Sequence, residues 1–237
     1  MARIAGLSPA ESFARRGWLS GQPADFRAAV LQRVRWLTLK PGVTVLHAGG
    51  DLGGAYGVLS GGVGMTTSNE FNGPVLGHIQ RTGAWFGYGA LLTGRKRIFG
   101  VRTMEPTVLA HLSLAAMTEL RASVPEATLY FGAMGEYGVD LTRSVIADLL
   151  IRRADHRIAA TLLRATGVLE GITPRTPEGF WINQADLGEM ANASRNHVNV
   201  TLQRFASMGW LTLGYGRIAI DDISALSSFA ASTDQVQ

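Results

Sequence analysis

Residues 182–211, INQADLGEMANASRNHVNVTLQRFASMGWL, decide how this chain is organised. They predict two short helices separated by a tight break. Asn183 is a good N-cap for the first helix, and Asp186, three residues later, can bond back to it as in a capping box. Ser194 caps the second helix, and Gly209 supplies its stop.

The second helix of this pair has an apolar and a polar side. Val198, Leu202 and Phe205 fall on the apolar side at helical spacing. Gly188 lies where two crossing helices need a small residue. The opposite side carries donors and acceptors of the kind that read base edges in a major groove, namely Arg195, Asn196, Asn199 and Gln203. An ordinary helical hairpin within a core is the alternative explanation.

The segment that follows favours a DNA-binding pair of helices over a helical hairpin within a core. Residues 210–213 and 217–220 are strand-like runs around Gly214-Tyr215-Gly216. They predict a β-hairpin at the place where a winged helix has its wing. The charged residue at the start of the second run is Arg217, which we expect to meet a DNA phosphate.

Residues 187–198 resemble the helix-turn-helix of the Crp/Fnr family of bacterial transcription regulators. That family's pattern is roughly L-(A/G)-x-x-x-(G/N)-x-S-R-(E/N)-x-V. The matching residues here are Leu187-Gly188, Asn192, Ser194-Arg195-Asn196 and Val198. The resemblance implies a transcription regulator and not an enzyme. In agreement, no catalytic set of nucleophile, base and orienting group with adjacent spacing is visible.

Composition limits what else the chain does. Its 237 residues are 46% hydrophobic, enough for a sizeable core in two modest domains or one large one. It has no cysteine, which excludes disulfides and thiolate metal sites. The net charge of +4 permits nucleic-acid binding without demanding it. With no long apolar run and no signal peptide, a cytoplasmic protein without a membrane span is expected.

The N-terminal half predicts a few helices followed by a β-domain. Residues 1–36 are interpreted as helical, with apolar positions at helical spacing from Ala24 to Trp36. From residue 37 to about 114, short strand-like runs alternate with glycine-rich turns, which is typical of an antiparallel barrel or sandwich. No Lys-Ser/Thr follows these glycines, so we interpret them as turn residues and not as a phosphate-binding loop.

This region resembles the cyclic-nucleotide-binding β-roll of the same family. The resemblance rests on Gly49-Gly50-Asp51, residues 56–61, residues 83–87 and residues 90–97. It places the ligand contacts at Gly87, Tyr88, Arg97, Ile98, Thr142 and Arg143. Relatives that bind cyclic AMP use a Glu, an Arg-Ser pair, a Thr and a Ser to hold the nucleotide.

Only two of those five polar contacts survive in this chain. Arg97 and Thr142 are kept, whereas Tyr88 replaces the Glu. Ile98 and Arg143 replace the two serines. We therefore interpret the site as degenerate or retuned, since an unpaired buried polar group costs about 1–3 kcal/mol. The site still allows a small-molecule effector, with cyclic AMP doubtful, and the sequence establishes no cofactor. Alternatively, Arg97 is only a solvated member of the run 95–97.

A long helix is predicted from about residue 136 to about 165. Leu141, Val145 and Leu149 fall on one face, with further apolar residues beside it. A helix apolar over so broad an arc must bury two sides, one on the barrel and one on a second chain. The family uses this helix for dimerisation, while a solitary core helix is the alternative. Asp155 is interpreted as the N-cap of a following helix, which places a hinge there.

A cupin-like enzyme or small-molecule-binding protein, with a C-terminal domain for protein contacts, is the competing hypothesis. A cupin metal site needs His-x-His with a further His and a carboxylate. The histidines at 47, 78 and 111 are isolated, so no metal site is expected.

We therefore expect an α+β fold with a double-stranded β-roll, a dimerisation helix and a winged helix-turn-helix. The domain boundaries are 1–135, 136–154 and 155–237. The expected DNA contacts are Ser194, Arg195, Asn196, Asn199, Val200, Gln203 and Arg217. Arg195 is placed in the first turn of its helix, on the face opposite Val198 and Leu202. The expected partners are a second copy, an inverted-repeat operator in double-stranded DNA, and RNA polymerase.

Overall fold

The computed structural model describes residues 13, 15–51 and 53–232, which form two compact units. The units comprise residues 1–74 with 79–142, and residues 75–78 with 143–237. The residues of the predicted N-terminal helical stretch numbered 1–12 and 14 lie outside the described part of the chain.

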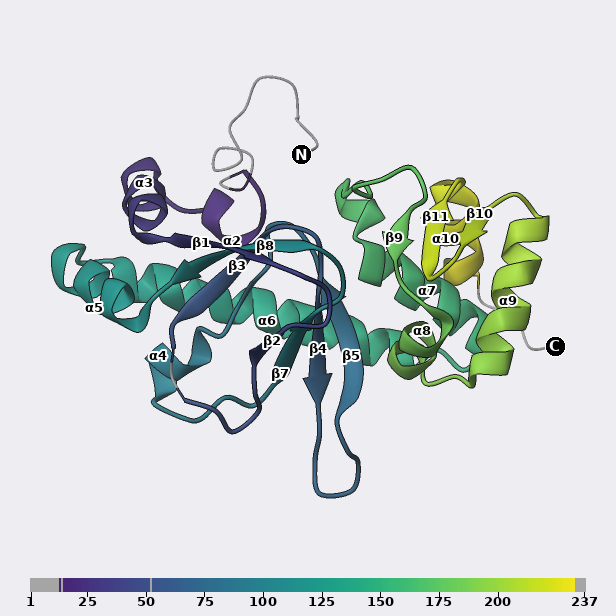
Figure 1. Cartoon of the computed structure of the whole chain (residues 1–237), viewed down its shortest axis with the longest axis horizontal. Helices are drawn as coiled ribbons and strands as arrows, with labels where there is room; N and C mark the ends of the chain where they lie inside the picture. Colours follow the sequence, from purple (N-terminus) through teal and green to yellow (C-terminus); the bar gives the residue numbers. More distant parts are fainter. Residues whose placement is uncertain (1–12, 14, 52, 233–237) are drawn as a thin grey trace. The chain divides into compact units, whose positions relative to one another are not determined.

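Apart from residues 75–78 of β5, which are counted with the second unit, the first unit is built on a β-roll of two four-stranded sheets, ordered β1-β8-β3-β6 and β2-β7-β4-β5 (Figure 1). Their strands are β1 (Arg35–Leu39), β2 (Thr44–Leu46), β3 (Ala55–Ser60), β4 (Val63–Thr67), β5 (Val75–Gln80), β6 (Trp85–Phe86), β7 (Gly100–Thr103) and β8 (Thr107–Leu112). β3 turns into β4 at Gly61, which has φ +90°. A Cβ on Gly61 would lie 2.6 Å from the Pro106 carbonyl oxygen, so this glycine is a turn residue as predicted.

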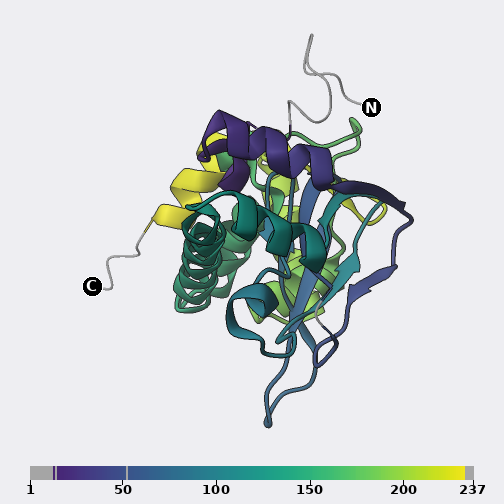
Figure 2. The same ribbon diagram turned by 90° about the vertical axis from the view of Figure 1, so that its left-hand side faces the viewer.

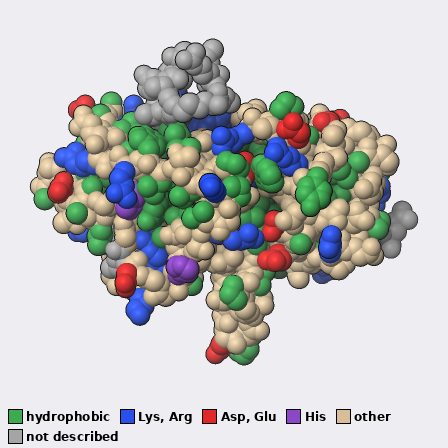
Figure 3. Space-filling model, viewed as in Figure 1, with side chains coloured by type: hydrophobic (Ala, Val, Ile, Leu, Met, Phe, Trp, Pro, Cys, Tyr) green, Lys and Arg blue, Asp and Glu red, His purple; other side chains and the backbone are tan. Residues whose placement is uncertain are grey.

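This unit has two clusters of buried hydrophobic side chains, and each of the two residues of β6 belongs to a different cluster. Successive side chains of a strand point to opposite faces, so Trp85 and Phe86 enter different clusters. Phe86 packs inside the roll with Val58 and Leu109. Trp85 packs on the other side, against the helices. The loop between β4 and β5 stands out from the surface (Figure 3), with Phe71 88% exposed.

Within the described residues, the helices that accompany the roll are α2 (Gly17–Ser20), α3 (Ala24–Arg33), α4 (Gly89–Thr93), α5 (Leu114–Ser123) and α6 (Ala127–Leu149). In Figure 2, where α6 is seen nearly end-on, the helix lies beside the strands. Trp18 stacks on Phe131 of α6, with ring centroids 6.0 Å apart. The predicted helix ending at Trp36 is wrong in its last residues. It ends at Arg33, because Trp36 pairs with Ala110 in the ladder between β1 and β8.

α6 begins at Ala127, nine residues before the start predicted at residue 136. The additional residues include Gly132 and Gly135, and Gly138 also lies inside the helix. A Cβ on Gly138 would lie 2.3 Å from the hydroxyl at the far end of the Tyr88 side chain. The helix tolerates this glycine in its interior despite the weak intrinsic helix propensity of glycine.

The second unit contains the end of α6 and a winged helix-turn-helix. Its further elements are α7 (Ala154–Thr166), the 3-10 helix η1 (Val168–Glu170), β9 (Phe180–Trp181), α8 (Gln184–Ala191), α9 (Arg195–Ser207), β10 (Leu211–Gly214), β11 (Arg217–Ile220) and α10 (Ile223–Ala231). α7 packs on α8, α9 and α10, and the three strands form one sheet in the order β10-β11-β9. The N-cap of α7 is Arg153 and not Asp155, which lies in the first turn.

Candidate nucleic-acid interface and effector site

Local side-chain bonds fix both helices of the helix-turn-helix. The Asn183 carboxamide oxygen accepts from the backbone N–H of Asp186 at 2.8 Å, which confirms the predicted N-cap of α8. The reciprocal bond runs from the Asn183 amide to the Asp186 carboxylate at 2.6 Å. Ser194 caps α9 by accepting from the backbone N–H of His197 at 3.2 Å. These caps satisfy backbone donors that the helix itself leaves unpaired.

The turn between the helices depends on two unusual backbone positions. Asn192 ends α8 in the left-handed region, with φ 46°. Gly188 lies so close to the turn that an added Cβ would be 2.7 Å from the Ala193 carbonyl oxygen. The turn therefore requires a small residue at Gly188, whereas the nearest atom of α9, in the Val198 side chain, would lie at an ordinary 3.7 Å from that Cβ.

The exposed side of α9 is centred on Asn196, Val200 and Gln203, all of which are exposed. Val198, Leu202 and Phe205 are buried, as predicted. The position given to Arg195 was wrong: it precedes Leu202 by seven residues, or about two turns, so both lie on the same side of α9. Arg195 is nevertheless exposed, in the first turn of the helix.

Two other predicted contacts have partners inside the domain. Asn199 is half-buried and accepts from the Gln184 side-chain amide at 3.0 Å. The Arg217 guanidinium donates to the Thr176 hydroxyl, lies 3.3 Å from the Glu178 carboxylate and stacks over the Trp181 ring at 4.2 Å. Arg217 therefore ties the base of the wing to the segment before β9. Tyr215, at the tip of the wing, is fully exposed.

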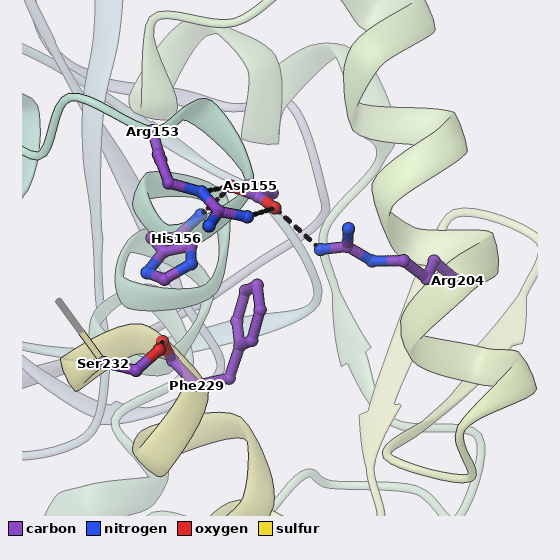
Figure 4. A network of polar contacts seen from close by, with 6 residues as sticks. All are labelled: Arg153, Asp155, His156, Arg204, Phe229 and Ser232. Atoms are coloured by element: carbon purple, nitrogen blue, oxygen red, sulfur yellow. Dashed lines mark hydrogen bonds and ion pairs between the residues drawn. The ribbon is translucent and has the colours of Figure 1, made fainter. Parts of the chain in front are cut away.

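An ion-pair network that the sequence did not reveal lies at the start of α7 (Figure 4). The Asp155 carboxylate accepts from Arg153 at 2.8 Å and from Arg204 of α9 at 2.9 Å. Arg204 also lies over the Phe229 ring, which packs on His156. Burial alone raises the pKa of Asp155, but the hydrogen bonds from both arginines outweigh it and hold the pKa far below its usual range.

Asp155→Asn is expected to lower stability in a pH-dependent way. An Asp with a depressed pKa stabilises the fold fully above its unfolded-state pKa of about 3.9, and this stabilisation is lost as pH falls through the folded-state value. We expect a loss of roughly 1–2 kcal/mol at pH 7, limited by the partial exposure of the arginines. Urea unfolding at pH 7 and pH 3 measures it. An equal difference at both pH values contradicts this origin of the stability.

In the first unit, Arg97 is buried and already bonded to the backbone. Its guanidinium donates to the carbonyl oxygens of Asp51 at 2.9 Å, Gly87 at 3.1 Å and Gly54 at 3.3 Å. Burial lowers the pKa of Arg97. The alternative that Arg97 is a solvated surface residue is therefore wrong. An anion reaching this guanidinium would have to compete with three carbonyl oxygens.

The other predicted ligand contacts are only partly brought together. Gly87 has φ +81°, and a Cβ on it would lie 2.7 Å from an Arg97 nitrogen. The Tyr88 ring packs against the helical core, with its hydroxyl at Gly138 of α6, and burial raises its pKa. Thr142, one turn after Gly138, donates to its carbonyl oxygen at 2.8 Å. Ile98 is 70% exposed, and Arg143 is exposed.

Comparison with known proteins finds two separate domains along the chain. The Crp-like helix-turn-helix domain matches residues 156–229, and the cyclic nucleotide-binding domain matches residues 36–123. The cAMP-activated global transcriptional regulator CRP of Haemophilus influenzae is 25% identical over 156 residues, which are 65% of this chain and 70% of that protein. The chain belongs to the Crp/Fnr family. It is a transcription regulator with a cyclic-nucleotide-binding-type domain and a DNA-binding helix-turn-helix.

Solved structures share this fold. A transcriptional regulator of the CRP/FNR family from Thermus thermophilus is 24% identical, covers 84% of this chain and 99% of its own, and has a TM-score of 0.63. FixK2 of Bradyrhizobium japonicum is 14% identical, covers 84% and 98%, and has a TM-score of 0.69. At such identities the likeness establishes the fold, with its β-roll and its helix-turn-helix.

The competing cupin-like hypothesis gains nothing from these matches, because the Crp/Fnr family is a family of regulators and not of enzymes. Within residues 13, 15–51 and 53–232, no three His, Asp or Glu side chains gather as a metal ion would need. Over the same residues, none of the helices is both long and apolar enough to cross a membrane.

Proposed function

We propose that this Crp/Fnr regulator binds an inverted-repeat operator as a homodimer, with one α9 helix in each of two successive major grooves. It would act in the cytoplasm, on DNA, and would meet RNA polymerase there. The observation that carries this proposal is α9 itself. Its apolar side is buried, its N-cap is complete, and its other side presents Asn196 and Gln203 as exposed side chains.

The exposed apolar side chains of α6 support dimerisation. Val139, Ile146 and Leu150 are 62%, 53% and 75% exposed. They are spaced by seven and four residues, and Leu150 directly follows the last residue of α6 with its backbone N–H bonded to the Ile146 carbonyl oxygen, so they form one stripe along the helix and its end. Gly132 and Gly135 precede the stripe at the same angle, and an added Cβ on either would meet nothing within 4 Å. Such a stripe of small and apolar residues suits a second α6 helix packed against it.

The residues on α9 also suggest which bases are read. Asn196 can bond both N6 and N7 of adenine, and Arg195 can fork onto O6 and N7 of guanine. Val200, where the family often has Arg, offers only an apolar contact, for example to a thymine methyl. Ser194 and Gln203 complete the proposed contacts. The half-site should therefore differ from the one most common in the family.

Selection of bound sites from a random DNA pool tests the proposal. We expect enrichment of an inverted repeat whose half-sites are centred about 34 Å, or one helical turn, apart. The same selection with Asn196→Ala should lose a base preference at one symmetric pair of positions. Recovery of sequences with no repeated element contradicts binding as a symmetric dimer.

The proposed effector site is a retuned one, and cyclic AMP is expected to bind weakly or not at all. The relative from Haemophilus influenzae is described as cAMP-activated. Here Arg97 is engaged by backbone carbonyl oxygens, and the bulky Tyr88 reaches α6. Isothermal titration of the purified protein with cyclic AMP should show no submicromolar binding. Tight binding would mean that other groups replace the missing ribose and phosphate contacts.

A further inference from the structure

One arginine joins the helix-turn-helix to the loop between α6 and α7. Arg157, in the first turns of α7, donates from Nε to the Ala191 carbonyl oxygen at 2.5 Å and from Nη2 to that of Asn192 at 3.1 Å. These are the last carbonyl groups of α8 and its C-cap. A helix leaves such groups without partners, and a cation at this end also suits the helix dipole.

The other edge of the same guanidinium faces the end of α6. Nη1 donates to the Ile151 carbonyl oxygen at 2.6 Å and lies 3.4 Å from that of Arg152. Both belong to the short loop between α6 and α7. Because the guanidinium is planar and its donors have a fixed geometry, bonding on two edges holds both segments in one arrangement. A lysine could not hold both segments in this way, because its ammonium group lacks a planar set of donors on two edges.

Two ion pairs continue this connection on either side. Asp148, near the end of α6, accepts from Arg164 of α7 at 2.6 Å, and both side chains are largely buried. Asp155 accepts from Arg204 of α9 at 2.9 Å. All of these contacts lie within the second unit. They run from the last turn of α6 through α7 to the turn and the recognition helix.

We propose that Arg157 is a positioning residue, which fixes the helix-turn-helix to the end of α6 without touching DNA. In a dimer, the two α6 helices then set the separation and rotation of the two α9 helices. The claim about the two α9 helices rests on the proposed binding of an inverted repeat by a homodimer. The rigidity itself is a property of the single chain and is measured without DNA.

The absence of cysteine from the sequence allows a direct measurement of that rigidity. Spin labels at Ala147→Cys on α6 and Ser207→Cys on α9, both exposed positions, report the distance across the connection. The doubly labelled chain is mixed with an excess of unlabelled chain, so that labels on two copies do not interfere. We expect one narrow distance distribution, and a clearly broader one in Arg157→Met. Arg157→Lys should broaden it as well.

Arg152→Met is the matched control. It removes one positive charge from the same loop, but the Arg152 side chain is exposed and only its backbone carbonyl meets Arg157. Its distribution should stay narrow. A distribution as narrow in Arg157→Met as in the wild type, with both variants folded by circular dichroism, overturns the proposal.

The second arm uses the selected operator and versions with one base pair inserted or removed between the half-sites. One base pair changes the relation of the half-sites by about 3.4 Å and 34°. Arg157→Met should bind the selected site roughly tenfold more weakly, as expected for lost hydrogen bonds to a charged group. It should lose far less on the altered spacings, so that the preference for one spacing flattens.

The outcomes separate the two proposals. A single half-site should bind both proteins nearly equally, because the helix-turn-helix itself stays folded. Equal losses on every spacing and on the half-site would assign Arg157 to simple capping of α8 and overturn the positioning role. If the wild type selects no inverted repeat, the proposed function fails, while the distance measurement still decides the role of Arg157.

Discussion

Leu149→Glu is expected to convert the regulator into a monomer that no longer holds its operator. Leu149 is 41% exposed at the end of α6, beside the stripe formed by Val139, Ile146 and Leu150. A second helix packed on this stripe would draw the new carboxylate out of water and place it among apolar side chains. Burying an unpaired charge costs several kcal/mol, enough to dissociate a dimer of ordinary affinity.

Static light scattering at micromolar concentration measures the change, together with a shift assay on the selected operator. Ala122→Glu is the matched control, because it adds the same charge to an exposed helical position on α5, outside α6. It should remain dimeric. A wild-type protein that is monomeric at this concentration, or a Leu149→Glu protein that is still dimeric, contradicts the proposed interface.

The helix-turn-helix was predictable because its signals are local. Asn183 and Ser194 cap helices through bonds to residues three positions later, and Gly209, with φ +76°, follows the end of α9. Each of these interactions is set by sequence spacing alone. The wing was predictable for the same reason, since Gly216 with φ +65° provides the tight turn between two strand-like runs.

The contacts missed by the sequence interpretation are long-range. Nothing near Arg97 in the chain indicates that the carbonyl oxygens of Gly54 and Asp51, more than forty positions away, would surround its guanidinium. Arg157 similarly meets Ala191 only because α7 packs on α8. Main-chain carbonyl groups occur at every position, so the sequence contains no specific sign of such partners.

Arg195→Ala is expected to remove sequence discrimination, whereas Arg217→Ala is expected to weaken binding to all sequences about equally. Arg195 is exposed in the first turn of α9, where recognition helices enter the groove. A lost bidentate contact to guanine should cost roughly 1–3 kcal/mol per half-site and flatten base preference at one symmetric pair of positions. Its place on the same side of α9 as Leu202 requires that the helix enter the groove by its N-terminal end.

Arg217→Ala distinguishes two roles of the Arg217 side chain, a contact to a DNA phosphate and a structural contact within the domain. If its guanidinium leaves Glu178 to meet a phosphate, Arg217→Ala should lower the salt slope by about one ion. If it only holds the wing against Trp181, affinity should fall with the slope unchanged.

Binding titrations of both variants on selected and scrambled DNA at several salt concentrations separate these results. The ratio of the two affinities measures what Arg195 reads, and the slope counts phosphate contacts. A parallel loss of both affinities in Arg195→Ala would make Arg195 a phosphate contact. The reading of bases would then fall to Asn196, Val200 and Gln203, which lie opposite the buried side of α9.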